Sequence, residues 1–252
     1  MKVATWNVNS IKQRTQHVLR WLEREKPDAL CLQELKGLEF PADTFKQAGY
    51  ESLFVAQKAY NGVAFLTREP AELISDKLTG EADEPARYME IKYKGITLVG
   101  IYAPNGNPLG TEKFDIKKSW TRKLIEKVQA KRKAREDFLV MGDFNIIPED
   151  RDCYDPALWR NDALYHPDSV ALLNELRNTG LTDAFRTGND EDAQYTFWDY
   201  QAGAWQRNNG IRIDHIMLSP RLADGLKNCV IYKQARAEEQ PSDHVPVWAI
   251  LS

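Results

Sequence analysis

The chain contains 252 residues, of which 42% are hydrophobic, 10% aromatic and 28% charged. This usage is typical of a globular protein and excludes a disordered tail, a collagen-like fibre and a coiled-coil rod. Lys and Arg number 34 against 37 Asp and Glu, for a formal net charge of −3. Any nucleic-acid surface must therefore be local, because the whole-chain charge does not attract a polyanion.

The cysteines and the N-terminal residues bear on the compartment. Cys31, Cys153 and Cys229 are widely spaced and form neither a disulfide framework nor a zinc-site pattern, which favours a reducing environment. The first residues lack an apolar signal-peptide core, and no apolar run approaches the roughly 20 residues of a membrane span. We therefore expect a cytoplasmic protein that has no membrane partner and is a monomer.

Strands and helices alternate in the first half of the chain. A strand is expected over 2–8, followed by Asn9 and Ser10 as caps of a helix that runs to about Glu25, because Asn and Ser accept hydrogen bonds from the first helical N–H groups. A second strand covers 28–33 and ends on Glu34. Shorter strand-like runs follow at 51–57, 62–67, 87–93 and 96–102, with turns at Asn61-Gly62 and Lys94-Gly95.

The second half continues the alternation. A long helix is predicted over 111–136, then a strand over 137–142 that ends in Asp143-Phe144-Asn145. A loop over 148–168 precedes a helix over 169–178, and strands follow at about 211–218, 228–234 and 245–251. This pattern predicts an α/β fold with mixed sheets. Since no linker or repeat interrupts the pattern, we expect residues 1–252 to form a single domain.

Polar side chains cluster where predicted strands begin or end, namely at Asn7, Glu34, Asp143, Asn145, Asp214, Asp243 and His244. If these ends share one sheet edge, they form an oxygen-rich site of the kind that selects Mg²⁺. The alternative is that the ends lie on opposite edges, and that each acid is an ordinary loop, turn or cap residue. Spacing alone leaves both open.

Six motifs follow one another along the chain, and they are Thr5-Trp6-Asn7-Val8-Asn9, Leu32-Gln33-Glu34-Leu35-Lys36, Tyr102-Ala103-Pro104-Asn105, Gly142-Asp143-Phe144-Asn145, Arg212-Ile213-Asp214 and Ser242-Asp243-His244-Val245-Pro246-Val247. In this order, from residue 3 to residue 248, they resemble the motif series of the exonuclease III family of abasic-site endonucleases, in the endonuclease/exonuclease/phosphatase superfamily. The resemblance implies a two-sheet α/β sandwich flanked by helices, with the active site at one end of the sheets. It also implies phosphodiester hydrolysis that depends on Mg²⁺, with Mn²⁺ as a substitute.

The resemblance also implies metal and phosphate contacts. Glu34 is the expected principal metal ligand, Asn7 contacts metal or phosphate beside it, and Asp243 lies near the metal. Tyr102 and Asn105 are expected to contact the scissile phosphate. Whether one or two metal ions bind stays open.

Proton transfer is assigned by the same resemblance. Asp143 is expected to orient or deprotonate the attacking water, and Asn145 to hold that water and a phosphate oxygen. Asp214 is expected to hold His244 toward the phosphate. A carboxylate near a water can act as a general base, and an Asp-paired His can donate to the phosphate, so the identity of the base, Asp143 or His244, stays open.

A basic segment favours DNA as the substrate. Residues 113–135 contain ten Lys or Arg against two acids, for a local net charge of +8, and Lys117 resembles the family's phosphate-contacting lysine. Within the helix, a cationic stripe is expected opposite the apolar residues Trp120, Leu124 and Val128, formed by Lys123, Lys127, Lys131 and Arg135. The alternative is an ordinary solvated helix face.

An apolar segment also favours DNA. Phe197, Trp198, Ile211 and Ile213 resemble residues that line the family's pocket for an extruded abasic sugar, and such a pocket selects by shape. The alternative is that these side chains are core, Trp198 above all. The resemblance implies Trp where this chain has Ile211, and therefore a pocket wall of different size. The loop over 202–210, with Trp205, is expected either to reach a DNA groove or to be anchored by that tryptophan.

We therefore expect a metal-dependent DNA phosphodiester hydrolase of base-excision repair. It would cleave 5′ to abasic sites and have 3′–5′ exonuclease and 3′-phosphodiesterase activity, on double-stranded DNA that carries abasic sites or blocked 3′ ends. The alternative within the superfamily is a phosphodiesterase or phosphatase acting on a small or lipid phosphate. A nucleic-acid-binding regulator without catalysis is disfavoured, because the expected catalytic residues are all present: Glu34, Asp143, Asn145, Asp214 and His244.

Overall fold

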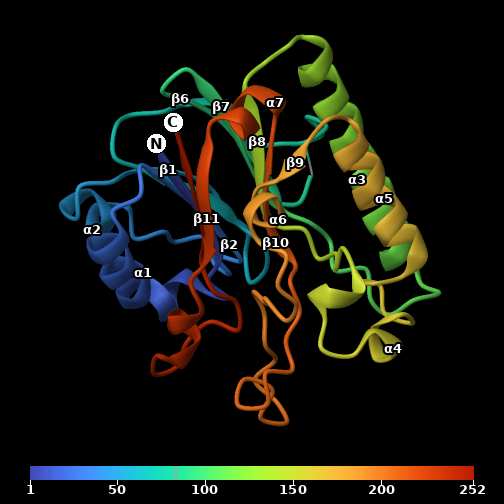
Figure 1. The fold of residues 1–252 in the computed structure, drawn as a ribbon. Coiled ribbons are helices and arrows are strands. Elements are labelled where there is room, and N and C mark those ends of the chain that lie inside the picture. The colour runs from blue at the N-terminus through green and yellow to red at the C-terminus, as the bar shows by residue number, and fades with distance from the viewer. Residues whose placement is uncertain (83) are drawn as a thin grey trace.

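Two six-stranded mixed sheets pack face to face in the computed structural model, which describes residues 1–82 and 84–252 (Figure 1). The first sheet has the order β11-β12-β1-β2-β4-β3, and only its β1–β2 pair is parallel. Its strands are β1 (Lys2–Asn7), β2 (Ala29–Gln33), β3 (Glu51–Val55), β4 (Val63–Thr67), β11 (Leu226–Ile231) and β12 (Val247–Leu251).

The second sheet has the order β5-β6-β7-β8-β10-β9, and only its β7–β8 pair is parallel. Its strands are β5 (Glu72–Ser75), β6 (Tyr88–Tyr93), β7 (Ile96–Tyr102), β8 (Phe138–Asp143), β9 (Thr182–Asp183) and β10 (Asp214–Leu218). Both β8 and β10 are buried along their whole length, as expected of central strands covered on both faces.

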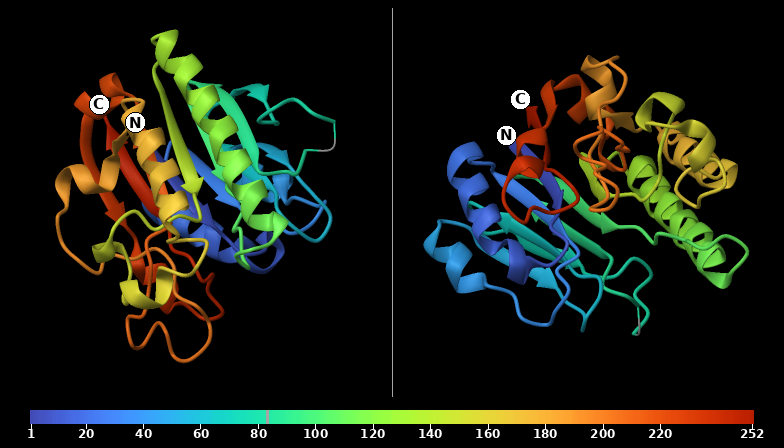
Figure 2. Two further views of the ribbon diagram at one scale, coloured as in Figure 1. Left: turned by 90° about the vertical axis from the view of Figure 1, so that its right-hand side faces the viewer. Right: turned by 90° about the horizontal axis from the view of Figure 1, so that it is seen from below.

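Helices cover the two outer faces (Figures 1 and 2). Helices α1 (Ile11–Glu25) and α2 (Ala42–Gln47) lie outside the first sheet, and α3 (Glu112–Lys133) and α5 (Pro167–Asn178) lie outside the second. Shorter elements occupy the connections: α4 (Pro156–Trp159), α6 (Ala184–Gly188), α7 (Pro220–Asp224), η1 (Asp150–Asp152) and η2 (Lys233–Ala237).

Two apolar cores hold these layers together. The larger fills the space between the sheets, where Cys31 and Phe65 of the first sheet meet Gly100 of the second, and it extends around the first sheet to α1 and α2. The other fills the space between the second sheet and α3 and α5, around residues such as Leu124. Because the sheets share one core, side chains at the same end of the two sheets are held in a fixed relation.

The expected fold class, a two-sheet α/β sandwich flanked by helices, is confirmed. The expected Lys94-Gly95 turn joins β6 to β7, with both residues at positive φ. The expected capping of α1 is wrong in its detail, because Ser10 has a φ of 93° and its side chain makes no capping hydrogen bond. Among the described residues, no helix is long and apolar enough to cross a membrane.

The strand register brings the polar strand ends to one edge of the sandwich. Asn7 pairs with Gln33 at the ends of β1 and β2, immediately before Glu34. In the second sheet, Asp143 pairs with Tyr102 on one side and with Asp214 on the other. Since parallel neighbours end at the same edge, these residues share one end of the fold.

Candidate active site

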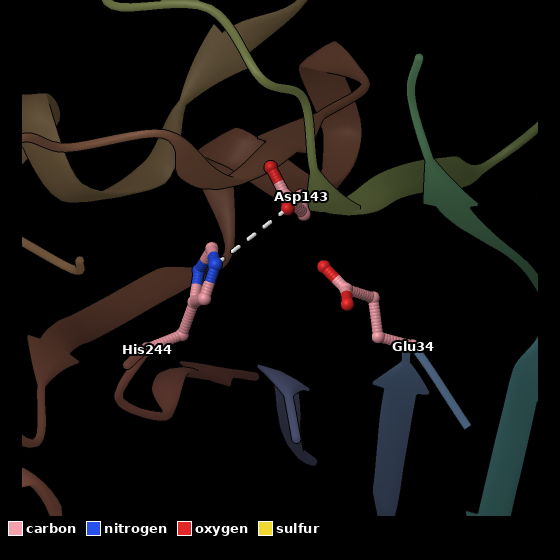
Figure 3. Close-up of side chains that lie close together, drawn as sticks. All are labelled: Glu34, Asp143 and His244. Atoms are coloured by element: carbon pink, nitrogen blue, oxygen red, sulfur yellow. Dashed lines mark ion pairs between the residues drawn. The ribbon is translucent and has the colours of Figure 1, made fainter. Parts of the chain in front are cut away.

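Glu34, Asp143 and His244 converge at this end of the two sheets (Figure 3). One ligand atom from each lies within 4.8 Å of the others. Glu34 follows β2, Asp143 ends β8 and His244 precedes β12, so the group draws on both sheets. The alternative that these strand ends lie on opposite edges is therefore wrong.

Glu34 is held by donors on both of its oxygens. Its Oε1 accepts a hydrogen bond of 2.9 Å from Asn7 Nδ2, and its Oε2 pairs with Lys36 Nζ at 2.8 Å. Burial raises the pKa of this carboxyl, but the Lys36 and Asn7 contacts outweigh burial and hold the pKa below its usual range. Glu34 is therefore anionic at neutral pH.

Asn7 lies between the two carboxylates and is fully buried. Its Nδ2 donates to Glu34 Oε1 at 2.9 Å and to Asp143 Oδ2 at 3.0 Å, while its Oδ1 accepts from the Asn9 N–H at 3.0 Å. The amide nitrogen rather than the oxygen thus faces the site. Asn7 keeps two mutually repelling carboxylates in place.

Asp143 reaches the site through a backbone that only glycine permits. Gly142 has a φ of 147°, and a Cβ there would lie 1.9 Å from the carbonyl oxygen of Ile101. Asp143 Oδ1 accepts from the Asn145 N–H at 2.8 Å, and Oδ2 lies 3.8 Å from His244 Nε2. Burial raises the pKa of Asp143 well above its usual range, against the opposing charge of His244.

Asp214 orients His244. Its Oδ2 lies 2.8 Å from His244 Nδ1, so the imidazole donates through Nδ1 and directs Nε2 toward Asp143. Burial opposes protonation of His244, but the charge and hydrogen bond of Asp214 raise its pKa above the usual value. The hydroxyl of Thr196 accepts from the N–H groups of Ile213 and Asp214 at 3.1 Å each, which fixes the start of β10.

Three further predicted residues border the cluster. Asn105 Nδ2 donates to Asn145 Oδ1 at 3.3 Å, and Asn145 Nδ2 donates to the carbonyl of Ala103 at 2.9 Å. Burial and the charges of Glu34 and Asp143 raise the pKa of Tyr102. Its phenol therefore stays protonated at neutral pH and is available as a neutral donor.

Asp243 lies outside the Glu34–Asp143–His244 group. Its Oδ1 accepts from Asn9 Nδ2 at 3.0 Å and from Ser242 Oγ at 3.3 Å. In this structure it therefore stabilises the loop that follows β1. Its expected place near a metal stays a prediction.

Lys117 is buried inside the protein, although it was expected at the surface. It is 1% exposed, and its Nζ donates to the carbonyls of Asn105 at 2.9 Å and Asn145 at 2.5 Å. The expected direct phosphate contact is therefore wrong for this conformation. Helical periodicity indicated this outcome, because residues three apart share a face and Lys117 lies between the buried Phe114 and Trp120.

The expected cationic stripe on α3 is wrong. Lys131 is buried and pairs with Glu90 and, at 3.2 Å, with Glu136, while Lys127 Nζ lies 3.8 Å from Glu90. Glu90 is a 1% exposed residue of β6. These lysines are not opposite the apolar face, because seven residues complete about two helical turns, which places Lys131 on the same side as Leu124.

A small, mostly apolar cavity of about 220 Å³ is lined in part by Tyr154, Trp159, Phe197 and Ile211, and Phe197 separates it from His244. The ring of Phe197 lies edge-on to that of His244, with centroids 4.9 Å apart.

The other expected pocket residues lie behind this wall. Trp198 and Ile213 are buried and are not among the cavity's lining residues. The expectation that Trp198 contacts the sugar is therefore wrong, since it is 0% exposed. Trp205 packs on Trp198 at 4.9 Å, so it anchors the loop over 202–210 rather than standing free to insert.

Sequence reasoning did not assign roles to three residues that shape the site. Lys36 pairs with Glu34 and donates to Asn9 Oδ1. Arg87 donates to the carbonyl of Tyr102 at 3.1 Å and its guanidinium lies 4.6 Å from that ring. Thr196 fixes Asp214, as described above. Of the three, only Lys36 belongs to a pattern that the sequence shows, the Leu32–Lys36 motif. Arg87 and Thr196 act through contacts with backbone groups, which no residue pattern predicts.

The donor set suits a hard divalent cation. Glu34 and Asp143 present carboxylate oxygens, the ligands that Mg²⁺ prefers, and a carboxylate oxygen accepts more than one partner. The buried cluster combines these acids with an Asp-oriented imidazole and an array of amide and phenol donors. Such a set can bind and polarise a phosphate ester and move a proton beside it, so the fold and site define a hydrolase of phosphate esters.

Comparisons with known proteins identify the family. Residues 4–244 match the Endonuclease/Exonuclease/phosphatase family. Exodeoxyribonuclease III of Haemophilus influenzae is 30% identical, over 99% of each chain. An AP endonuclease structure from Archaeoglobus fulgidus has a TM-score of 0.94 at 33% identity, and covers 100% of this chain and 99% of its own.

The structure of the 3′ phosphatase NExo from Neisseria, bound to a product DNA hairpin, has a TM-score of 0.93 at 36% identity, with 100% of this chain and 99% of that chain covered. The chain therefore belongs to the exonuclease III type of abasic-site endonuclease within the Endonuclease/Exonuclease/phosphatase family. It is a phosphodiester-hydrolysing nuclease of that type.

Proposed function

We propose that this nuclease acts in base-excision repair by incising double-stranded DNA immediately 5′ to abasic sites, and that it also trims 3′ ends through exonuclease and 3′-phosphodiesterase activity. The observation that carries the proposal is the Glu34–Asp143–His244 cluster next to a small apolar cavity walled by Phe197 and Ile211. The cluster would catalyse hydrolysis, and the cavity would select the nucleotide next to which the strand is cut.

A divalent cation, Mg²⁺ with Mn²⁺ as a substitute, would be held chiefly by Glu34, with Asp143 beside it. When bound, such an ion neutralises phosphate charge and favours departure of the leaving oxygen. Asn7 holds both carboxylates in position through its Nδ2. Asp243 would contribute through water at the edge of the site.

The remaining side chains would bind the phosphate and move protons. Asp143 and His244 flank the same space, with Nε2 and Oδ2 3.8 Å apart, so one of them takes the proton of the attacking water. Tyr102 lies at the end of β7, and Asn105 and Asn145 lie in the adjoining loops. All three would donate hydrogen bonds to phosphate oxygens. Such preorganised donors are worth most where charge develops in the transition state.

Shape would provide the selectivity for abasic sites. The cavity that Phe197 separates from His244 has mostly apolar walls, from Tyr154, Trp159, Phe197 and Ile211. A sugar without its base can be extruded into a small apolar pocket more readily than a full nucleotide, because no base has to be unpaired and accommodated. Trp159 of α4 contributes to this wall.

The test is incision of a labelled duplex that carries one tetrahydrofuran abasic analogue, with Mg²⁺ and with EDTA. We expect a single cut 5′ to the analogue with Mg²⁺ and none with EDTA. An undamaged duplex of the same sequence serves as the control. An intact lesion strand in the presence of Mg²⁺ would refute the endonuclease activity.

A second candidate is an enzyme that acts mainly on 3′ ends, favoured by the 36% identity to the protein named as a 3′ phosphatase. A duplex with a 3′-phosphate at a nick separates the two, because this activity would release phosphate while leaving the abasic duplex uncut. Phosphate release from an inositol phosphate with no action on either DNA would instead indicate a small-phosphate enzyme.

A further inference from the structure

Lys117 connects two loops of the active site from inside the protein. Its Nζ donates to the carbonyl of Asn105, which follows β7, at 2.9 Å and to the carbonyl of Asn145, which follows β8, at 2.5 Å. The side chain is 1% exposed. One amino group on α3 therefore bridges the loops behind the ends of two adjacent strands.

Both loops carry amides that the proposed function places on the phosphate. Asn105 Nδ2 donates to Asn145 Oδ1 at 3.3 Å, so the two amides are already linked. Asn145 has a φ of 49°, in the left-handed region, and a non-glycine residue keeps this conformation only where its surroundings enforce it. Asp143 holds the N–H of Asn145 at 2.8 Å, and Lys117 holds its carbonyl.

The neighbouring chain is adapted to the lysine. Gly106 follows Asn105 with a φ of 91°, and a Cβ at that position would lie 2.6 Å from Cδ of Lys117. The aliphatic part of Lys117 therefore passes where any other residue at 106 would clash. The close contact between the buried Lys117 side chain and the backbone at position 106 therefore explains why that residue is glycine.

We propose that Lys117 is a positioning residue, which orients the amides of Asn105 and Asn145 toward the scissile phosphate and does not itself contact nucleic acid. The inference rests on the proposed function for the role of the two amides. It differs from a phosphate-contact role in a measurable way, because a positioning residue affects the rate of the chemical step, whereas a phosphate contact affects affinity and its dependence on salt.

The test compares Lys117→Met with wild type in single-turnover incision and in equilibrium binding of the abasic duplex at several salt concentrations. Methionine has a similar length and removes both hydrogen bonds. We expect the rate to fall about 10- to 100-fold, since small misplacements of phosphate-binding groups are costly, with unchanged affinity and salt slope. Lys133→Met, at an exposed position in the last turn of the same helix, is the control and should match wild type.

Two outcomes of these assays would overturn the proposal. One is an unchanged rate. The other is weaker binding with a salt slope reduced by about one unit, which is the mark of a lost phosphate contact. Should Lys117→Met fail to fold, as judged by circular dichroism, Lys117→Gln keeps an N–H donor but loses the charge, and it should show a smaller loss of rate with unchanged affinity and salt slope; a reduced salt slope in that variant would also overturn the proposal.

A crystal structure of Lys117→Met separates this inference from the proposed function. Wild type that fails to cut the abasic duplex would refute the proposed function alone. In the variant structure, we expect Asn145 to leave its left-handed conformation and the Asn105–Asn145 hydrogen bond to be lost. Loops that keep their wild-type positions would refute the positioning role, whatever the substrate.

Discussion

At the scale of single residues, the site is a set of acids whose mutual repulsion is offset by specific donors. Asn7 bridges Glu34 and Asp143, and Lys36 pairs with Glu34. These donors hold the pKa of Glu34 below its usual range, whereas burial still raises the pKa of Asp143. The Asp214–His244 pair is the part of this arrangement whose charge and geometry can be separated by substitution.

We predict that Asp214→Ala lowers the single-turnover rate about 10²- to 10⁴-fold, the range for loss of a general acid or base, because His244 loses both its orientation and its charge partner. Asp214→Asn should lose less, since its amide oxygen can still accept from His244 Nδ1. Rapid-quench incision at saturating enzyme measures both rates. Equal losses in the two variants would show that orientation contributes nothing beyond charge.

Residue identity also explains which site assignments could be made from the sequence. Asn7, Glu34, Asp143 and His244 lie at or beside strand ends, but their spacing left open whether those ends share an edge, and only the motif resemblance implied their proximity. The contacts of Arg87 and Thr196 are made to backbone groups, and these depend on the path of loops that have no periodic pattern. The helical spacing of Lys117 from Phe114 and Trp120 indicated that it is buried, but its charge favoured the interpretation as an exposed phosphate contact.

At the scale of elements, a second buried charged network supports the start of β10. Arg212 is 1% exposed and donates to Asp152 at 2.7 Å, to Asp183 at 2.9 Å and to His215 Nδ1 at 3.0 Å. His215 Nε2 lies 3.1 Å from the carbonyl of Ile146, so it donates there. Because Arg212 and His215 flank Asp214, this network anchors the strand that carries the active-site aspartate.

This network predicts a loss of stability in acid. Burial, assisted by the charge of Arg212, lowers the pKa of His215 to about 4, so the unfolded chain binds a proton at a higher pH than the folded chain. Its contribution is therefore complete above the ordinary histidine pKa and is lost as the pH falls. Between pH 7 and pH 5, we expect the free energy of unfolding to fall by about 2 kcal/mol on this account.

Urea unfolding of wild type and His215→Asn at the two pH values checks this prediction. The variant should be less stable at pH 7, because it loses the packing of a buried ring, but its decline toward pH 5 should be shallower by about the same 2 kcal/mol. Parallel declines in the two proteins would show that His215 does not titrate in this range.

The elements that the sequence predicted best are those with strong periodicity. The central strands and α1, α3 and α5 lie within a few residues of their expected bounds, because continuous apolar runs and helical spacing mark them. The two-residue β9 and the short α4, α6 and α7 had no such pattern. Their position is set by capping contacts, such as Asp183 with the N–H of Phe185 at 3.1 Å, and by packing against the sheets.

At the scale of the whole molecule, the active site spans the interface between the two sheets. Asn7, Glu34 and His244 belong to the first sheet and its loops, whereas Tyr102, Asp143 and Asp214 belong to the second. Their relative positions therefore depend on the apolar core that the sheets share. The basic side chains of α3 do not form the single cationic surface that was expected, because Lys127 and Lys131 pair with the buried Glu90.

The most direct test of this account is the single-turnover rate of abasic-duplex incision by Asp143→Asn, measured with its affinity for the same duplex. The substitution preserves shape and removes the charge, so we predict a rate loss of about 10³-fold or more with affinity within about threefold of wild type, because the carboxylate acts mainly in the transition state. Asp192→Asn, at an exposed position, should behave as wild type. A rate within tenfold of wild type, or equal losses of rate and affinity, would contradict the assignment of this cluster as the catalytic centre.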